Sequence, residues 1–258
     1  MSTQSPMPVP GGLRRWVDDV TVLTAGGSGE RRPHVHLPDA ATSLVLRTVS
    51  SRHADLLAVG PRTRASYHAG KEFPLCLRLR LRPGVARLLL GVPVRELVNQ
   101  AVPVSELWTG VDGLSELGTD PGRLLAYLEP VLLARIATAA GTELARSELV
   151  RTAAEALTGR PERRREHMPV LARRLAVSER HLRALFADCV GLSPKRFERI
   201  ARVRGVLARG GRPAPCWAQL ATTAGYYDQS HMSAEFSTMM GVSPAAYFAG
   251  RLPPVQRC

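Results

Sequence analysis

The feature that most constrains this chain is a repeat near its C-terminus. The stretch HLRALFADCVGLSPKRF at 181–197 falls over HMSAEFSTMMGVSPAAY at 231–247, with an offset of 50 residues. The positions that recur are Phe186 with Phe236, Gly191 with Gly241, Ser193-Pro194 with Ser243-Pro244, and Phe197 with Tyr247. Because only two copies are found, the sequence predicts a pair of small modules rather than a long solenoid array.

Each copy has the pattern of a helix–turn–helix. In the first copy, Ser178 is a good N-cap for a second helix that is expected to run from Glu179 to about Val190. In the second copy, Asp228 stands at the matching cap position and Gly225 stands in the turn, where glycine best tolerates a positive φ. The core of the two copies is expected to contain Leu182, Phe186, Phe197, Met232, Phe236 and Tyr247.

Residues 168–248 resemble the DNA-binding domain of the AraC/XylS family of bacterial transcription regulators. The resemblance is carried by AGYYDQSHMSAEFSTMMGVSPAAY in the second copy and by LAVSERHLRALFADCVGLSPKRFERI in the first. It implies two recognition helices, held by the helix between the copies so that they enter successive major grooves about 34 Å apart. Residues 34–120 resemble the small β-rich N-terminal domains that accompany this type of DNA-binding domain.

The first turn of each recognition helix is where side chains meet base edges. Gln229, Ser230 and His231 occupy this place in the second copy, and Arg180 and Arg183 in the first. Glutamine pairs with adenine and arginine with guanine through two hydrogen bonds each. The competing interpretation is that these polar residues are merely exposed.

Two further groups of residues bear on DNA binding. Arg196, like Arg199, Arg202 and Arg204, lies near the connecting helix and is assigned to phosphate contacts or to solvated charge. The family often has an arginine where this chain has Ala184 and Ala234. Base-specific contacts are therefore expected to be fewer, with more of the specificity resting on DNA shape.

The placement of charge supports a nucleic-acid partner for the C-terminal part. The net charge of the chain is +13. Residues 160–258 hold 17 basic and 7 acidic residues, against 18 and 15 in residues 1–159. Nearly all of the surplus thus lies in the part that carries the repeat, as expected for a surface that faces phosphates.

The N-terminal half has the signals of strands followed by helices. PLCLRLRLRPG alternates strictly, with leucines on one face and Arg78, Arg80 and Arg82 on the other. A solvated outer face is favoured for these arginines over the wall of an anion pocket. Leucine-rich residues from Gly122 to Thr158 predict two or three helices, as core or as a dimer surface.

The predicted fold class is multidomain α+β: a β-rich, small, barrel-like N-terminal domain with trailing helices, then an all-α domain of two helix–turn–helix units. The expected divisions are a flexible N-terminus (1–12), a β-rich sensor domain (13–120), a helical hairpin that could dimerise (121–158), a linker (159–168) and the DNA-binding domain (169–258). The N-terminal domain is expected to regulate the C-terminal one by ligand or partner binding.

Composition favours a cytoplasmic, non-enzymatic protein. Four scattered cysteines form no CxxC pair, and no segment has the pattern of a signal peptide or a membrane span. No phosphate-binding loop or nucleophile motif stands out, and no cofactor or bound metal is predicted. The expected partners are a double-stranded DNA operator, a small-molecule effector at the N-terminal domain, RNA polymerase and a second copy of the chain, and no membrane.

Two alternative functions stay open at this point. His34 and His36 form an HxH pair that could bind a metal on a barrel strand, with His53, His68 and Asp39 as further ligands. This would make the chain a metal-binding barrel enzyme or a metal sensor with a DNA-binding tail. The second alternative is a ligand-free regulator that is controlled by protein–protein interaction.

Overall fold

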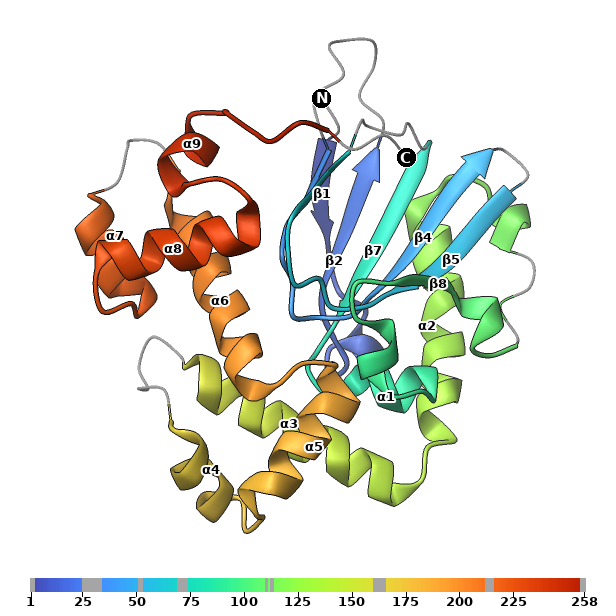
Figure 1. The fold of residues 1–258 in the computed structure, drawn as a ribbon. Helices are drawn as coiled ribbons and strands as arrows, with labels where there is room; N and C mark the ends of the chain where they lie inside the picture. Colours follow the sequence, from blue (N-terminus) through green and yellow to red (C-terminus); the bar gives the residue numbers. More distant parts are fainter. Residues whose placement is uncertain are drawn as a thin grey trace. The chain divides into compact units, whose positions relative to one another are not determined.

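The computed structural model describes residues 3–24, 34–50, 53–68, 74–109, 111, 114–159, 166–211 and 216–255 (Figure 1). The chain divides into two compact units. Unit 1 comprises the described residues within Met1–Glu30, Ala41–Pro61 and Lys71–Ser193. Unit 2 comprises those within Arg31–Ala40, Arg62–Gly70 and Pro194–Cys258. Most of the predicted linker, residues 160–165, lies outside the described residues.

Unit 1 is built on an antiparallel sheet of six strands in the order β1-β2-β7-β4-β5-β8. The strands are β1 (Thr3–Met7), β2 (Val17–Thr24), β4 (Ser43–Ser50), β5 (His53–Val59), β7 (Leu75–Leu81) and β8 (Ala101–Pro103). The predicted alternation in β7 is confirmed, because its four leucines are buried on one face. The fold class predicted from the sequence, a β-rich N-terminal region followed by a helical C-terminal region, is thereby confirmed.

The arginine face of β7 is less exposed to solvent than predicted, and its arginines form ion pairs. The side chains of Arg78 and Arg80 are 24% and 18% exposed. Arg78 donates to Asp19 at 3.3 Å and Arg80 to Asp18 at 2.5 Å, and both aspartates lie on the neighbouring strand β2. Cross-strand pairing of opposite charges explains why this face can be half-buried.

The expectation of a loose N-terminus was wrong for the residues that the structure describes there. Thr3–Met7 form β1, which pairs with β2 from Thr3↔Thr24 to Met7↔Val20. Pro6 is compatible with this strand because β1 lies at the edge of the sheet, where a missing backbone donor can face away from the ladder. Strands β2 and β3 (His34–His36) likewise precede Thr42, where the sequence shows its first clear strand signal.

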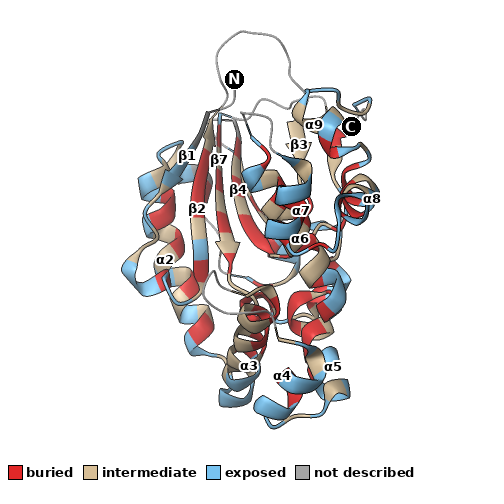
Figure 2. Ribbon diagram, turned by 90° about the vertical axis from the view of Figure 1, so that its left-hand side faces the viewer, coloured by how far each residue is buried: buried red, intermediate tan, exposed pale blue. Residues whose placement is uncertain are grey.

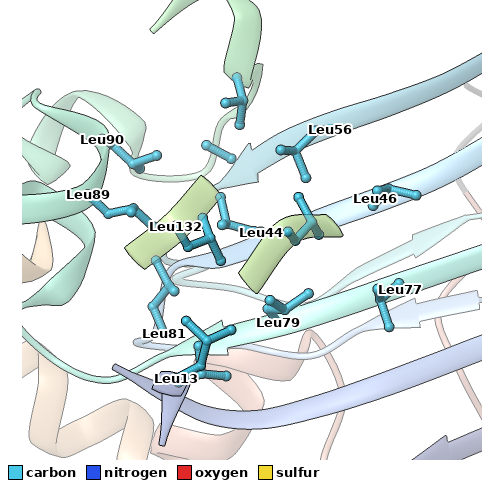
Figure 3. Close-up of a cluster of buried hydrophobic side chains, with 14 of the residues drawn as sticks. Leu13, Leu44, Leu46, Leu56, Leu77, Leu79, Leu81, Leu89, Leu90 and Leu132 are labelled. Carbon is cyan, nitrogen blue, oxygen red and sulfur yellow. The ribbon is translucent and has the colours of Figure 1, made fainter. Parts of the chain in front are cut away.

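The helices of unit 1 complete the core of the sheet. They are α1 (Val85–Leu90), α2 (Pro121–Ala137), α3 (Gly141–Thr158), α4 (Met168–Arg174) and α5 (Glu179–Val190), with short 3-10 turns η1 (Gly11–Leu13), η2 (Val94–Leu97), η3 (Val104–Glu106) and η4 (Leu114–Leu117). Leucines of β4, β7, α1 and α2 meet in one cluster (Figure 3). Burying each such side chain stabilises the fold by about 1.5–3 kcal/mol.

The leucine-rich helices α2 and α3 belong to this buried core. Their buried residues are Leu124, Leu125, Leu128, Leu132, Ile136, Ser147, Val150, Ala153, Ala154 and Leu157. None of their large hydrophobic side chains is exposed in the described part of the chain. Of the two interpretations of this stretch, the structure therefore favours core over a free dimer surface.

No single helix among the described residues is long and apolar enough to cross a membrane; α2 and α3 pass that test only as a pair bent by 110°.

Unit 2 joins two short N-terminal strands to the C-terminal helices. It contains β3, β6 (Ser66–His68), α6 (Pro194–Arg209), α7 (Trp217–Ala224), α8 (Gln229–Met240) and α9 (Pro244–Phe248). The backbone nitrogen of Ala65 donates to the carbonyl oxygen of Met239 at 2.7 Å, and the Tyr67 hydroxyl donates to that of Met240 at 2.6 Å. These two bonds satisfy carbonyls at the C-terminal end of α8, which have no partner within their own helix.

Candidate nucleic-acid interface

The first repeat forms a helix–turn–helix from α4 and α5. The backbone reverses at Ala176, which has a φ of +54°. The side chain of Ser178 then accepts a hydrogen bond from the backbone nitrogen of His181 at 3.1 Å and caps α5. Leu182, Leu185 and Phe186 are buried, so the opposite side of α5 faces outward. The cap and the helix bounds predicted from the sequence are confirmed.

The second repeat forms the same structure from α7 and α8. Gly225 takes the turn with a φ of +82°, and Asp228 accepts from the backbone nitrogen of His231 at 2.7 Å. The bond from Tyr226 N to Ala221 O, 2.9 Å, matches the bond from Val177 N to Ala172 O, 3.0 Å, in the first copy. The two copies thus share their turn and cap, and both α5 and α8 combine buried with exposed residues (Figure 2).

The matched turns give a prediction with opposite signs in the two copies. Ala176 and Gly225 occupy equivalent places, but only glycine adopts a positive φ without strain. Ala176→Gly is expected to raise the free energy of unfolding by about 0.5–1 kcal/mol, and Gly225→Ala to lower it by about 1 kcal/mol or more. Urea unfolding of each variant checks this. A lower free energy of unfolding in Ala176→Gly would show that the positive φ of Ala176 is not strained.

The outward face of α5 carries the predicted base-contacting arginines. Arg180 and Arg183 are both exposed. Arg183 pairs with Glu179 one turn earlier on the helix, whereas Arg180 makes no hydrogen bond or ion pair with any described residue. An exposed pair of this kind contributes only about 0.3–0.5 kcal/mol, so Arg183 can exchange Glu179 for another acceptor at little cost. Ala184 is exposed on the same face.

The outward face of α8 is polar but nearly uncharged. Gln229, Ser230 and His231 are exposed at its first turn, and Ala234 is exposed one turn later. The His231 ring lies edge-on to Tyr226, with 5.4 Å between the ring centroids. The structure therefore brings the three predicted side chains together, while α5 and α8 present different chemistry: guanidinium groups on one and amide, hydroxyl and imidazole groups on the other.

Sequence reasoning missed Tyr227, which directly precedes the cap of α8. Its side chain is 94% exposed, the most exposed of the large hydrophobic residues described. An aromatic side chain held at the start of a recognition helix can stack on a base or contact a thymine methyl group. The signal in the sequence is the second of the two tyrosines between the turn glycine and the capping aspartate.

Arg199, Arg202 and Arg204, near the connecting helix, are held by carboxylates within unit 2. Arg199 and Arg202 both bind Glu235, at 2.7 Å and 3.0 Å, and Glu235 is buried at 6% exposure. Arg204 binds Asp39 at 3.2 Å and donates to the carbonyl oxygen of Pro38. Arg196 is the exposed one of the four, at the start of α6 beside exposed Lys195. Of the group, Arg196 is thus best placed for a phosphate.

The histidines of the HxH pair lie on β3, and His68 lies opposite His34 on β6. The rings of His34 and His36 are 4.6 Å apart, but the guanidinium of Arg62 lies 3.4 Å from His36 Nδ1. A cation at that distance opposes metal binding. Among the described residues, no group of three or more His, Cys, Asp or Glu side chains is arranged to hold a metal ion. The metal-centred alternative therefore receives no support.

This histidine cluster predicts that the protein loses stability in acid. Burial, followed by the charge of Arg62, lowers the pKa of His36 from 6.5 to about 3. In the unfolded chain the same group takes up a proton near pH 6.5, so protons favour unfolding between pH 6.5 and 3. Chemical denaturation at pH 7.5 and at pH 5 is expected to show lower stability at pH 5, and His36→Gln is expected to reduce that difference. An unchanged difference would mean that other groups cause it.

Comparison with known proteins identifies the helical region. A family model described as a helix-turn-helix domain matches residues 171–250. Among solved structures, the DNA-binding domain of AdpA in complex with a target DNA is 24% identical, covers 41% of this chain and 90% of its own, and has a TM-score of 0.34. The C-terminal domain of AraT, a response regulator from Geobacillus stearothermophilus, is 23% identical over 41% of this chain and 88% of its own, with a TM-score of 0.36.

ToxT from Vibrio cholerae matches over most of the length, covering 96% of each chain at 11% identity and a TM-score of 0.42. With TM-scores below 0.5, these likenesses carry no functional conclusion. A search of curated proteins gives no significant match. The matched region includes both turns, both caps and the partly exposed helices α5 and α8. Residues 171–250 thus match a helix-turn-helix domain over the whole of the repeated region.

Proposed function

We propose that this chain binds a specific DNA operator through two recognition helices, α5 and α8, which enter successive major grooves. The observation that carries the proposal is the duplicated geometry, in which both helices are capped alike and present polar side chains at their first turn. The first turn of a recognition helix is where base edges are contacted. One chain would thereby make the two-groove contact that simpler helix–turn–helix proteins make as dimers.

The two helices differ in the bases that they suit. Arg180 and Arg183 on α5 suit guanine, whose O6 and N7 atoms accept two hydrogen bonds from a guanidinium group. Gln229 on α8 suits adenine, with Ser230 and His231 as weaker contacts and Tyr227 alongside. The expected operator therefore has two unlike half-elements, with guanine favoured in the half that α5 contacts. Lys195 and Arg196 would contact phosphates and set the register without reading sequence.

The proposed division of labour assigns regulation to residues 13–120 and DNA binding to residues 169–258, with 121–158 between them. Support comes from N-terminal segments that contact the recognition helices within each unit. In unit 1, α5 packs against α1, α3 and η2. In unit 2, Tyr67 on β6 binds the end of α8. A ligand or partner that changes these contacts would change DNA binding. A small-molecule effector, RNA polymerase and a second copy of the chain are the proposed partners, in the cytoplasm.

The test is selection of the full-length protein on a random DNA library, followed by binding to the enriched sequence at several salt concentrations. The full chain is needed because α5 packs on segments far upstream: a side chain at Gly191 would lie 2.7 Å from the carbonyl oxygen of Val94. The expected result is a site with two half-elements about one helical turn apart. Lys195→Ala and Arg196→Ala should each lower the salt dependence by about one phosphate contact while leaving the selected sequence unchanged.

Salt-sensitive binding that enriches no sequence would contradict the proposal. It would mean that the chain holds phosphates without reading bases. Enrichment of only one half-element would still support sequence-specific DNA binding. It would contradict the proposal that both helices enter successive major grooves.

A further inference from the structure

An open cavity of about 400 Å³ in unit 1 is lined by charged side chains alone: Arg14, Arg15, Arg82, Glu148 and Arg151. They come from three segments far apart in sequence. Arg14 and Arg15 lie between η1 and β2, Arg82 directly follows β7, and the other two lie three residues apart on α3. The segments are closely packed, because a Cβ at Gly84 would lie 2.5 Å from the carbonyl oxygen of Ser147. The cavity thus has a fixed frame.

The arginines of this cavity keep donors available for a ligand. Arg14 makes no side-chain hydrogen bond or ion pair with any described residue, although its carbonyl oxygen accepts from Arg82 Nε at 3.1 Å. Arg82 NH1 lies 3.9 Å from Asp18, and Arg15 NH2 lies 3.9 Å from Glu148. Both distances are too long for hydrogen bonds, and each guanidinium has five donors.

Glu148 is the single acidic group in the lining. It is bound by Arg151, which also binds Glu155, and it lies 3.9 Å from Arg15. The hydrogen bond from Arg151 is the main cause of the lowered pKa of Glu148, so the carboxylate stays charged at neutral pH. Among the lining residues, the four arginines outnumber this carboxylate by three.

We propose that this cavity binds a small organic anion that carries at least two phosphate or carboxylate groups. Guanidinium groups match both kinds of group through paired hydrogen bonds. Most ligand sites of comparable volume are mainly apolar, and the absence of an apolar side chain from this lining argues for a hydrophilic ligand. Several separate arginines around one cavity suit a ligand with more than one anionic group.

The site also has a route to the DNA-binding region. Helix α3, which carries Glu148 and Arg151, packs against α5 and α4. An anion that moves the charged side of α3 would therefore be coupled to the first recognition helix. This consequence rests on the proposed function, whereas binding of the anion does not.

The experiment is isothermal titration of the full-length protein, without DNA, using pyrophosphate and citrate as separate probes at constant ionic strength. Saturable binding of at least one probe is expected, and the comparison shows whether phosphate or carboxylate groups are preferred. Arg14→Ala should weaken binding by about tenfold, because it removes one charge-assisted contact. Glu148→Gln should tighten binding several-fold, because it removes the competing carboxylate. Arg123→Ala, at an exposed position on α2, is the matched control and should change nothing.

The opposite signs of the two cavity variants separate a site from general charge effects. Equal losses in Arg14→Ala and Arg123→Ala would overturn the proposal, and so would weaker binding in Glu148→Gln. Thermal unfolding without ligand shows whether either variant is folded, and Arg82→Gln then serves as a second test if Arg14→Ala is not. If neither probe binds but Arg14→Ala lowers DNA affinity, the cavity contacts DNA phosphates and the proposed ligand is wrong. Failure of anion binding with intact operator binding rejects this site alone.

Discussion

Glu235→Ala is expected to lower the free energy of unfolding of unit 2 by about 3–5 kcal/mol, because it removes the buried carboxylate that pairs with Arg199 and with the half-buried Arg202. The Glu235 carboxylate accepts from Arg199 Nε at 2.7 Å, from Arg202 Nε and Nη2 at 3.0–3.2 Å, and from the Tyr226 hydroxyl at 2.9 Å. The Arg202 side chain is 17% exposed and also lies over the Tyr226 ring. These groups lose their acceptor together, so the cost exceeds that of one hydrogen bond.

Hydrogen exchange of the α6 and α8 amides, together with urea unfolding, measures this loss. Glu179→Gln is the matched control, since Glu179 is a partly exposed carboxylate on α5 that pairs with one arginine of its own helix. It should cost no more than about 0.5 kcal/mol. A loss below about 1 kcal/mol in Glu235→Ala would mean that solvent satisfies the two arginines as well as the carboxylate does.

The same network shows where sequence reasoning reached its limit. The caps at Ser178 and Asp228, the turn at Gly225 and the bounds of α5 follow from rules that operate over a few residues, and all were predicted. The partners of Arg199 and Arg202 lie more than 30 residues away on another helix, and no local pattern marks them. Their assignment to phosphates or solvent therefore missed the buried carboxylate.

Long-range packing also explains the other differences. β1 carries little apolar signal because its stability comes from backbone pairing with β2, which a window of sequence does not show. The compact units do not follow chain order either: β3 and β6 belong to the same unit as α8, whereas α5 belongs to the unit of the six-stranded sheet. The arginine-lined cavity needs three segments that are brought together only by the fold. The outward faces of α5 and α8, in contrast, were predictable because helical periodicity and capping fix them locally.

Arg180→Ala is expected to weaken operator binding roughly ten- to hundredfold and to relax base preference in one half-element only. A bidentate arginine–guanine contact contributes about 1–3 kcal/mol of discrimination. Arg180 is exposed on the first turn of α5 and has no partner among the described residues, so no internal bond must break before it binds a base. Arg183 first has to leave Glu179, and its alanine variant is expected to lose somewhat less.

Gln229→Ala is the complementary variant, because it removes the side-chain amide from the first turn of α8 and leaves α5 unchanged. Selection of operators for each variant should show relaxed base preference in different half-elements. The double variant should lose the sum of the binding free energies lost in the two single variants, since Arg180 and Gln229 lie on separate helices. Arg123→Ala removes an exposed charge without changing either helix and should retain the full selected site. If Arg180→Ala weakened all sequences equally and reduced the salt dependence, Arg180 would be a phosphate contact. Specificity at that half would then depend on DNA shape, as the exposed alanines Ala184 and Ala234 on both helices would lead one to expect.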